Sequence, residues 1–368
     1  MSEQQQQRQA YFSLLFGKLY KNELASQRAA IAEAVAERET KDARPKSKRS
    51  KKTAAAAATA ETGRQTNVFH RLDERVDVRA LDWVYANRVA LLPQASVTLF
   101  EQYAAQVRAS ATGDTRTVTY CFASSGGGRI YADGSLSLAS FSKPLRATLG
   151  ASLYHDIDME NTHPRIMLYF ARKHGWKHSS LRRYIEFRDA VLGELKCERA
   201  IAKQIFLALL MGGSSKSVTE RRAVAPVELS KFARAFKQEL KDLASNIYRS
   251  YPKYHELVHR THEPDSHMAN FSALSYLLQE CETTALTEAC RFFESKGWRV
   301  GVLIHDGFLV YKRDDALVDD ELLRGASQHV RERCHGVEIP FVLKQFPDPL
   351  PGFPFIDDDA TTATATTD

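Results

Sequence analysis

The chain lacks the sequence features of a secreted protein, of a membrane-spanning protein and of a protein stabilised by a structural zinc ion. No apolar run approaches about 18 residues, the length that a membrane-spanning helix needs. The first residues, Met1-Ser2-Glu3 followed by glutamines, have no apolar signal-peptide core. The cysteines are odd in number and form no CxxC pair, which disfavours a disulfide framework or a structural zinc site. They are Cys121, Cys197, Cys281, Cys290 and Cys334. These absences predict an intracellular protein in a reducing compartment.

The standard phosphate-binding loops are also missing. The glycine-rich stretch at residues 124–131 has the spacing of neither a P-loop nor a dinucleotide fingerprint. The net charge is only +6, from 51 Lys and Arg against 45 Asp and Glu, which suits a polyanionic partner without requiring one. A basic run at residues 44–52 could be a nuclear-localisation signal, a nucleic-acid patch or a solvated linker.

Hydrophobic periodicity predicts a mixed α and β protein. We expect strands at residues 117–123 and 337–343, and a hairpin of two buried strands within residues 300–311. The remaining pattern is helical, at residues 78–109, from Thr162 to Gly175, 181–211, beyond Pro226, 275–295 and 318–333.

Two predicted strands each end in an acidic residue. Asp306 falls at the turn of the hairpin, and an earlier apolar run ends in Asp156-Ile157-Asp158. Two strands that each deliver an Asp could hold a pair of divalent cations about 3.5–4 Å apart, which serves phosphoryl transfer. The alternative is that both acids only cap turns. Asp156 shares a strand face with Asp158, and strand geometry alone does not choose between them.

Two cations share one face of a predicted helix. Arg199 and Lys203 are four residues apart, and the residues around them are largely apolar. Cations in apolar surroundings need an anionic partner, such as a triphosphate, to which Lys203 could donate a proton. The alternative is a salt bridge to Glu194 or Glu198.

Histidines adjoin the acids, and a polar helix face precedes the hairpin. Imidazole seldom ligates Mg²⁺, so we interpret His305 as structural support for Asp306. Gln279 and Glu282 share a helix face that could reach the minor groove of a duplex or His305, or could be solvated.

Taken in order, these segments resemble the palm of superfamily A DNA polymerases and single-subunit phage-type RNA polymerases, in particular the compact branch called transposon–virus polymerases (TV-Pol). Residues 158–165, DMENTHPR, look like motif A. Arg199-x-x-x-Lys203 with Met211-Gly212 has the spacing of motif B, and residues 304–307, IHDG, look like motif C. Gly128-Arg129 is similar to a strand that contacts the primer end. The resemblance covers residues 117–345.

The resemblance implies a right-hand polymerase with an antiparallel palm sheet backed by helices, helical fingers and a reduced thumb. The expected segments are an N-terminal helix and flexible basic, alanine-rich linker (1–65), a thumb-like region with the Gly-Arg strand (66–150), palm (151–180), fingers (181–265), palm (266–354) and a disordered tail (355–368).

The implied activity is DNA-directed DNA synthesis without proofreading. The alternatives are a primase-like or RNA polymerase that uses rNTPs, a catalytically degenerate palm that serves as a nucleic-acid-binding scaffold, and a metal-dependent nuclease. Sugar choice stays open, because His163 stands where the family's ribonucleotide-excluding Glu falls, and Leu207 and Met211 replace aromatic residues.

The resemblance also assigns expected site residues. Two Mg²⁺ ions, or Mn²⁺ in their place, are expected at Asp158, Asp306 and Met159. The nucleotide is expected at Arg199, Lys203, His163, Met211 and Gly212, and the primer-template at Arg129, Arg146, Gln279 and His305. The expected partners are primer-template nucleic acid and nucleoside triphosphates, and could include a helicase or other replication proteins, with no membrane.

Overall fold

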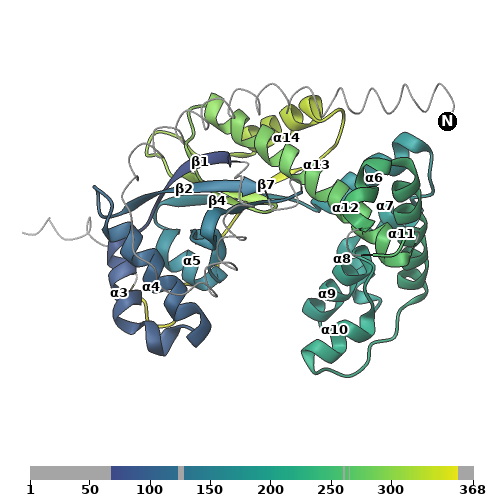
Figure 1. Cartoon of the computed structure of the whole chain (residues 1–368), viewed down its shortest axis with the longest axis horizontal. Coiled ribbons are helices and arrows are strands. Elements are labelled where there is room, and N and C mark those ends of the chain that lie inside the picture. Colours follow the sequence, from purple (N-terminus) through teal and green to yellow (C-terminus); the bar gives the residue numbers. More distant parts are fainter. Residues whose placement is uncertain (1–67, 123–127, 260–261, 265, 355–368) are drawn as a thin grey trace, which may run out of the picture. The chain divides into compact units, whose positions relative to one another are not determined.

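The computed structural model describes residues 68–122, 128–259, 262–264 and 266–354, which all belong to one unit, Arg64–Asp368 (Figure 1). The expected N-terminal helix and linker, the basic run at 44–52, part of the glycine-rich stretch and the C-terminal tail lie outside the described residues. Within the described residues, no helix has the length and apolar character needed to cross a membrane.

The N-terminal part of the described chain is a three-stranded antiparallel sheet with three helices. Its strands β1 (Val68–Arg75), β2 (Thr115–Phe122) and β3 (Ile130–Ala132) lie in that order. Its helices are α3 (Val78–Leu91), α4 (Gln94–Arg108) and α5 (Lys143–Gly150), with short 3₁₀ turns at Asp133–Ser135 and Leu138–Ser140. Residues 78–109 are helical as predicted, in two helices that a short break separates. Pro93 holds Leu92 in an extended conformation (φ −106°, ψ 143°), because the proline ring clashes with a helical preceding residue.

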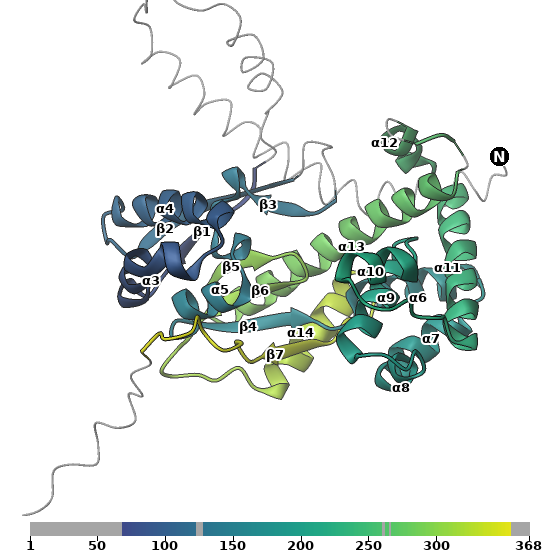
Figure 2. The same ribbon diagram turned by 90° about the horizontal axis from the view of Figure 1, so that it is seen from below.

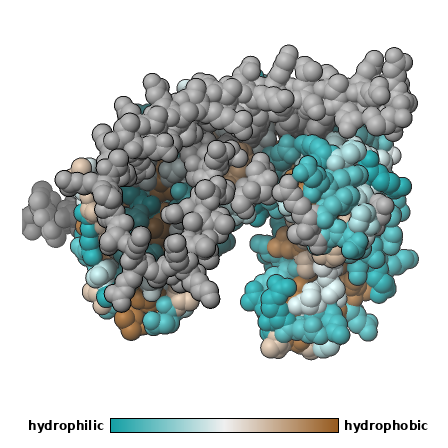
Figure 3. All heavy atoms as spheres, in the orientation of Figure 1, coloured by the Kyte–Doolittle hydropathy of each residue, from teal (hydrophilic) through white to brown (hydrophobic). Residues whose placement is uncertain are grey.

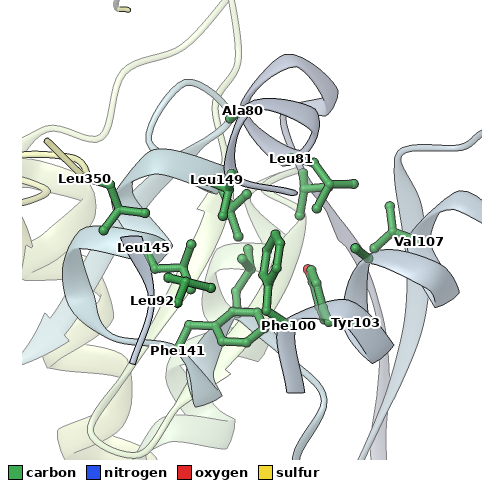
Figure 4. Close-up of a cluster of buried hydrophobic side chains, with 14 of the residues drawn as sticks. Ala80, Leu81, Leu92, Phe100, Tyr103, Val107, Phe141, Leu145, Leu149 and Leu350 are labelled. Carbon is green, nitrogen blue, oxygen red and sulfur yellow. The ribbon is translucent and has the colours of Figure 1, made fainter. Parts of the chain in front are cut away.

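A cluster of buried apolar side chains joins these helices. In Figure 4, Phe100, Tyr103 and Phe141 point toward one another, with Leu81 and Leu149 nearby. The Phe141 ring meets Phe100 and Tyr103 edge-on, at centroid distances of 5.9 and 5.0 Å. Burying each such ring contributes on the order of 2 kcal/mol.

The second sheet carries the acidic strand ends. Its strands are β4 (Tyr154–Met159), β5 (Val300–Ile304), β6 (Gly307–Tyr311) and β7 (Phe341–Lys344), all antiparallel in the order β5-β6-β4-β7. The predicted α and β class with an antiparallel sheet and the predicted hairpin are confirmed. The last strand begins at Phe341 rather than 337, since Pro340 has no N–H for a ladder. Helices α13 (His267–Ser295) and α14 (Asp320–Arg333) pack on this sheet (Figure 2).

Helices make up the remainder of the described chain. They are α6 (Thr162–His174), α7 (Ser179–Glu186), α8 (Arg188–Gly193), α9 (Arg199–Leu210), α10 (Ser215–Arg222), α11 (Lys231–Ser250) and α12 (His255–His259), with a 3₁₀ turn at Pro252–Tyr254. Much of the face of α8 to α11 visible in Figure 3 is hydrophilic.

The predicted helix boundaries are right in one place and wrong in another. Helix α6 ends at Gly175 as expected, with Gly175 in the left-handed conformation (φ 67°). The single helix predicted over residues 181–211 is wrong, because the chain leaves helical geometry at Phe187 (φ −127°, ψ 42°) and turns at Lys196 (φ 52°). Helix α13 begins earlier than predicted, where the Ser266 side chain caps it by accepting from the Ala269 N–H.

A buried carboxylate ties the first sheet to its helices. Glu74 on β1 is fully buried and accepts hydrogen bonds from the Tyr103 hydroxyl (2.6 Å), the Ser137 hydroxyl (2.7 Å) and the Leu138 N–H (2.9 Å). Burial raises the pKa of Glu74, and these donors offset part of that rise. Each donor is therefore expected to matter for stability.

We expect Tyr103→Phe to lower the free energy of unfolding by about 1–3 kcal/mol, because it leaves one oxygen of a buried carboxylate without a donor. Urea denaturation measures the change. Tyr85→Phe is the control, since it removes a hydroxyl but keeps a ring that stacks under Arg88 and Arg108. Equal unfolding midpoints for the two variants would contradict the role given to Tyr103.

Candidate active site

Strand pairing brings Asp158 and Asp306 together. Asp158 on β4 lies opposite Gly307 on β6, and the next residue, Met159, donates its N–H to the Asp306 carbonyl at 2.8 Å. Asp306 sits in the two-residue turn between β5 and β6, where His305 adopts a positive φ of 20°. The two carboxylates thus belong to adjoining strand ends, although 148 residues separate them in sequence (306 − 158).

Gly307 permits this close approach. A Cβ on Gly307 would lie 2.5 Å from the Ile157 carbonyl oxygen and 3.3 Å from the Asp158 Cα, both backbone atoms. Backbone atoms of paired strands cannot move aside without breaking the ladder. A side chain here would therefore separate β6 from β4 at the place where the two acids meet.

Asp158 is a partly buried acid with a cationic neighbour. Its side chain is 16% exposed, and the Lys344 ammonium on β7 lies 2.6 Å from its Oδ1. Burial raises the pKa of Asp158, the Lys344 ammonium opposes the rise, and the negative charge of Asp306 adds to it. A cation that bridged the two carboxylates would relieve this repulsion.

Asp156 stands two residues further from the turn. It lies opposite Leu309 on β6 and Lys344 on β7. Burial raises the pKa of Asp156, and Asp158 adds to the rise, whereas Lys344 and Arg146 oppose it. The register thus puts Asp158, and not Asp156, beside the hairpin turn.

Two lysines act on Asp158, and the charges of both also reach Lys203 on α9. Burial lowers the pKa of Lys203 on α9, and the positive charges of Arg188, Lys143 and Lys344 lower it further. Lys143 and Lys344 are also the cations that act on Asp158. Within the described part of the chain, neither Lys143 nor Lys203 has an acidic partner within 4 Å. Unpaired lysines around an acid pair favour a polyanionic ligand with cations of its own.

Helix α9 presents a stripe of four side chains at steps of four residues. Arg199, Lys203, Leu207 and Met211 are all exposed, with Leu207 at 43% and Met211 at 38%. The opposite face of α9 is buried, so the helix is two-sided rather than surrounded by apolar groups. Arg199 pairs with Asp189 at 2.6 Å, and not with Glu194 or Glu198 as the alternative predicted.

Gly212 lies in the tight turn that directly follows the exposed stripe of α9. It has a φ of 80°, and a Cβ there would lie 2.6 Å from the Phe271 ring. Exposed Met211 and tightly packed Gly212 thus follow directly on α9. Their contact with a nucleotide stays a prediction.

Helix α13 contacts the Gly128-Arg129 segment closely. Thr283 donates its hydroxyl to the Gly128 carbonyl at 2.9 Å, and a Cβ on Gly128 (φ 86°) would lie 2.8 Å from the Gln279 side-chain oxygen. Gln279 also donates to Ser275 at 2.9 Å. Only glycine fits both the backbone conformation and the helix surface at this position.

His163 and Arg129 meet at one carboxylate. Glu282 on α13 has a side chain that is 1% exposed; Arg129 binds it at 2.6 and 3.1 Å, and the His163 Nε2 lies 2.8 Å from its Oε2. Burial would raise the pKa of Glu282, but His163 and Arg129 together lower it. Glu282 is therefore ionised at neutral pH.

His305 and Arg146 have neighbours of their own. The His305 ring meets Tyr131 edge-on at a centroid distance of 5.5 Å, and burial together with the charge of Arg129 lowers the pKa of His305. The Arg146 guanidinium donates to the carbonyls of Leu138 (3.0 Å) and Phe141 (3.1 Å). A primer-template contact for Arg146 stays a prediction.

The sequence-based reasoning missed several residues of the site. Lys143, Lys344 and Arg188 were not singled out, because nothing local marks a lysine or arginine as facing a distant acid. Arg188 also donates to the Asn161 side-chain oxygen at 2.5 Å, where Asn161 has a left-handed φ of 53°. The left-handed backbone of Asn161 had no local signal, because the residue before a helix ordinarily has an extended backbone.

The donors for a metal ion are few. Among the residues that the structure describes, no three His, Cys, Asp or Glu side chains are grouped so that they could hold a metal ion. The Met159 side chain is buried, so only its backbone carbonyl could serve, and that oxygen already accepts from the Thr162 hydroxyl at 2.9 Å. A carbonyl has two lone pairs, so this bond leaves one free.

The proteins similar to this chain include a virophage protein and a polymerase domain of known structure. No model of a known protein family matches the chain. A putative helicase, V13 of Sputnik virophage, is 32% identical over 215 residues, which are 56% of this chain and 27% of V13. The POL domain of Pol1 from M. smegmatis, solved with DNA primer-template and dNTP, is 14% identical, with a TM-score of 0.45 over 72% of this chain and 55% of that one. The chain thus spans about a quarter of V13 and about half of the Pol1 domain.

We expect Gly307→Ala to lower the free energy of unfolding by about 1–3 kcal/mol or more, because the new methyl group meets backbone on β4. The midpoint of urea unfolding measures this. Gly193→Ala is the matched control, since a Cβ there meets open space in α8 and alanine favours helix by roughly 0.5–1 kcal/mol. If both variants unfolded like the unmodified protein, β6 would not approach β4 this closely.

Proposed function

We propose that this chain is a template-directed nucleic-acid polymerase that transfers nucleotides at Asp158 and Asp306. One observation carries the proposal. Two carboxylates meet at adjoining ends of antiparallel strands. Lys344 pairs with one of them, and the charge of Lys143, which has no acidic partner in the described part of the chain, also acts on it. An acid pair alone would suit a nuclease or a structural turn equally well. The lysines favour a substrate that is itself polyanionic.

The acid pair fits divalent cations. Asp158 has its pKa raised by burial and by Asp306, and in this structure the Lys344 ammonium partly neutralises it. Carboxylate and carbonyl oxygens are the donors that Mg²⁺ prefers, and it commonly takes its other ligands from water and substrate phosphates. We propose that Asp158, Asp306 and the Met159 carbonyl would hold two Mg²⁺ or Mn²⁺ ions. When bound, such ions would polarise phosphate oxygens and stabilise developing charge.

The lysines and the α9 stripe suit a nucleoside triphosphate. We propose that Arg199 and Lys203 bind the phosphates, with Met211 and Gly212 closing the pocket. In the reaction the primer 3′-hydroxyl loses its proton to water, and its oxygen forms a bond to the α-phosphorus as the bond to pyrophosphate breaks. The lowered pKa of Lys203 makes its ammonium a better proton donor to the departing pyrophosphate. The ion pair with Asp189 is exposed and therefore weak enough to exchange for a phosphate.

We propose that the described chain is divided as a right hand. Residues 66–150 would be the reduced thumb-like region, 181–265 the fingers, and 151–180 with 266–354 the palm. Arg129, Gln279 and His305 would contact the primer-template, since they gather around Glu282 and the hairpin turn. DNA synthesis is the leading activity that we propose, and RNA or primase-like synthesis is the alternative, because His163 takes the place in the sequence where the family's ribonucleotide-excluding Glu falls. A helicase is a plausible partner, given the name of the virophage relative.

Asp158→Asn and Asp306→Asn should each reduce primer extension by about 100-fold or more. Each change removes an anionic ligand that stabilises the transition state, and every tenfold loss corresponds to about 1.4 kcal/mol. Extension of a labelled primer on DNA and RNA templates, with dNTPs and rNTPs supplied separately, measures both rate and sugar choice. Duplex affinity and melting temperature should stay close to those of the unmodified protein.

Asp156→Asn is the control for this pair. It makes the same chemical change on the same strand face, two residues further from the turn, and should retain most activity. An inactive Asp156→Asn beside an active Asp158→Asn would place the reacting centre two residues away from our assignment.

Lys203→Ala should slow single-turnover extension by about 100-fold or more, the scale of a lost general acid. Arg199→Ala should mainly raise the nucleotide concentration needed for half-maximal rate, because Arg199 contributes binding rather than a proton. Rapid-quench kinetics over a range of nucleotide concentrations separate the two effects. Unchanged kinetics in both variants would show that neither residue binds the nucleotide. Lys203 would then be only a surface cation, and Arg199 only the partner of Asp189 in a salt bridge.

A further inference from the structure

Glu282 is the most completely buried acid near the site, and it lies between two groups that come from different parts of the chain. His163 is in the first turn of α6, directly after the acidic end of β4. Arg129 leads into β3, 34 residues before His163 in sequence (163 − 129). Glu282 is on α13, which contacts both. One carboxylate therefore fixes two side chains that otherwise share no partner.

The contact geometry is specific. The Arg129 guanidinium takes both oxygens of Glu282, through Nε at 2.6 Å and Nη2 at 3.1 Å. Such two-point binding fixes the plane of the guanidinium as well as its position. The His163 Nε2 lies 2.8 Å from the Oε2 that also accepts from Arg129, in a close contact whose angle does not suit a hydrogen bond. A shift of the carboxylate toward either partner thus changes its contact with the other.

The surroundings leave Glu282 little freedom. Next to it on α13, Thr283 donates to the Gly128 carbonyl at 2.9 Å, so the backbone beside Arg129 is held by the same helix. The Glu282 side chain is 1% exposed, against 12% for His163 and 27% for Arg129. Removing one partner from a buried charge leaves it uncompensated, which is costly. The exposed parts of His163 and Arg129 remain available to a ligand, whereas Glu282 is not.

We propose that Glu282 is a positioning residue that couples discrimination of the nucleotide sugar by His163 to binding of the primer strand by Arg129. This inference rests on the proposed polymerase function and adds a regulatory link within its site. Glu282 touches neither substrate. It orients the His163 ring beside the sugar and the Arg129 guanidinium beside the primer end, so that a duplex bound at Arg129 sharpens the choice made at His163.

The test uses Glu282→Gln with Glu280→Gln as the matched control. Glu280 is two residues away on α13 and takes part in a separate pair with Lys253 and Tyr254. Primer-template affinity is measured by fluorescence anisotropy with a primer that ends in a 3′-dideoxynucleotide. The dissociation constants of dNTP and rNTP for that stalled complex are then measured, so neither readout needs turnover.

Glu282→Gln should weaken primer-template binding about tenfold and lower the preference between dNTP and rNTP several-fold, because the neutral amide holds neither partner as firmly. Glu280→Gln should change neither. The loss of sugar preference should vanish when His163 is already alanine, and the loss of duplex affinity should vanish when Arg129 is already alanine. Such non-additivity is the signature of a shared interaction.

Three results would overturn the proposal. The first is that Glu282→Gln leaves primer-template affinity and sugar preference unchanged. The second is that its effect on sugar preference persists when His163 is already alanine. The third is that Glu280→Gln has effects of the same size. If Glu282→Gln melts below the assay temperature, the cycle between Arg129→Ala and His163→Ala replaces it, and additive effects would refute the coupling. An unmodified protein that binds no recessed primer or nucleotide would refute the proposed function itself. Normal binding with no coupling would refute only the role of Glu282.

Discussion

The near-contact of two backbones at Gly307 is the constraint on which the site depends. Because Gly307 has no side chain, β6 can approach the Ile157 carbonyl of β4, and the same register puts Asp158 next to the turn that carries Asp306. Two like charges at such a place are unfavourable without compensation. Lys344 at the end of β7 and Lys143 on α5 supply that compensation for Asp158. The sheet thus provides the geometry and the nearest cation, and α5 adds a second positive charge.

The arrangement separates rigid from adaptable groups. Asp158 lies on β4, which pairs with β6 on one side and with β7 on the other, and Gly128 and Gly212 are packed against Gln279 and Phe271. Arg199, Lys203 and Met211 are exposed on α9 and can change rotamer without disturbing the core. A site that must hold successive substrates of different sizes benefits from this division. The acids keep one position while the long side chains follow the ligand.

The features that could be predicted from the sequence are those that depend on near neighbours. The hairpin at 300–311, the acid at its turn and the glycine stop of α6 followed from alternation and turn chemistry over a few residues. The break at Phe187 was missed because no proline or glycine marks it, whereas Gly193 at the end of α8 was a signal for the turn at Lys196 that the prediction passed over. The pairing of Arg129 and His163 with Glu282, and the approach of Lys344 to Asp158, depend on tertiary packing across 119 or more residues (282 − 163), which periodicity does not report.

The face of α13 that contacts the Gly128-Arg129 segment has a consequence for how such a sequence can diverge. Gln279, Glu282 and Thr283 all lie on it, and each contacts a backbone or side-chain group that tolerates few replacements. A substitution at Glu282 would leave a cation at Arg129 without its partner, so the two positions are expected to change together or not at all. Gly128 and Gln279 constrain each other as well, because a Cβ on Gly128 would clash with the Gln279 side chain. Related chains should therefore show correlated substitutions between this helix face and the Gly128-Arg129 segment.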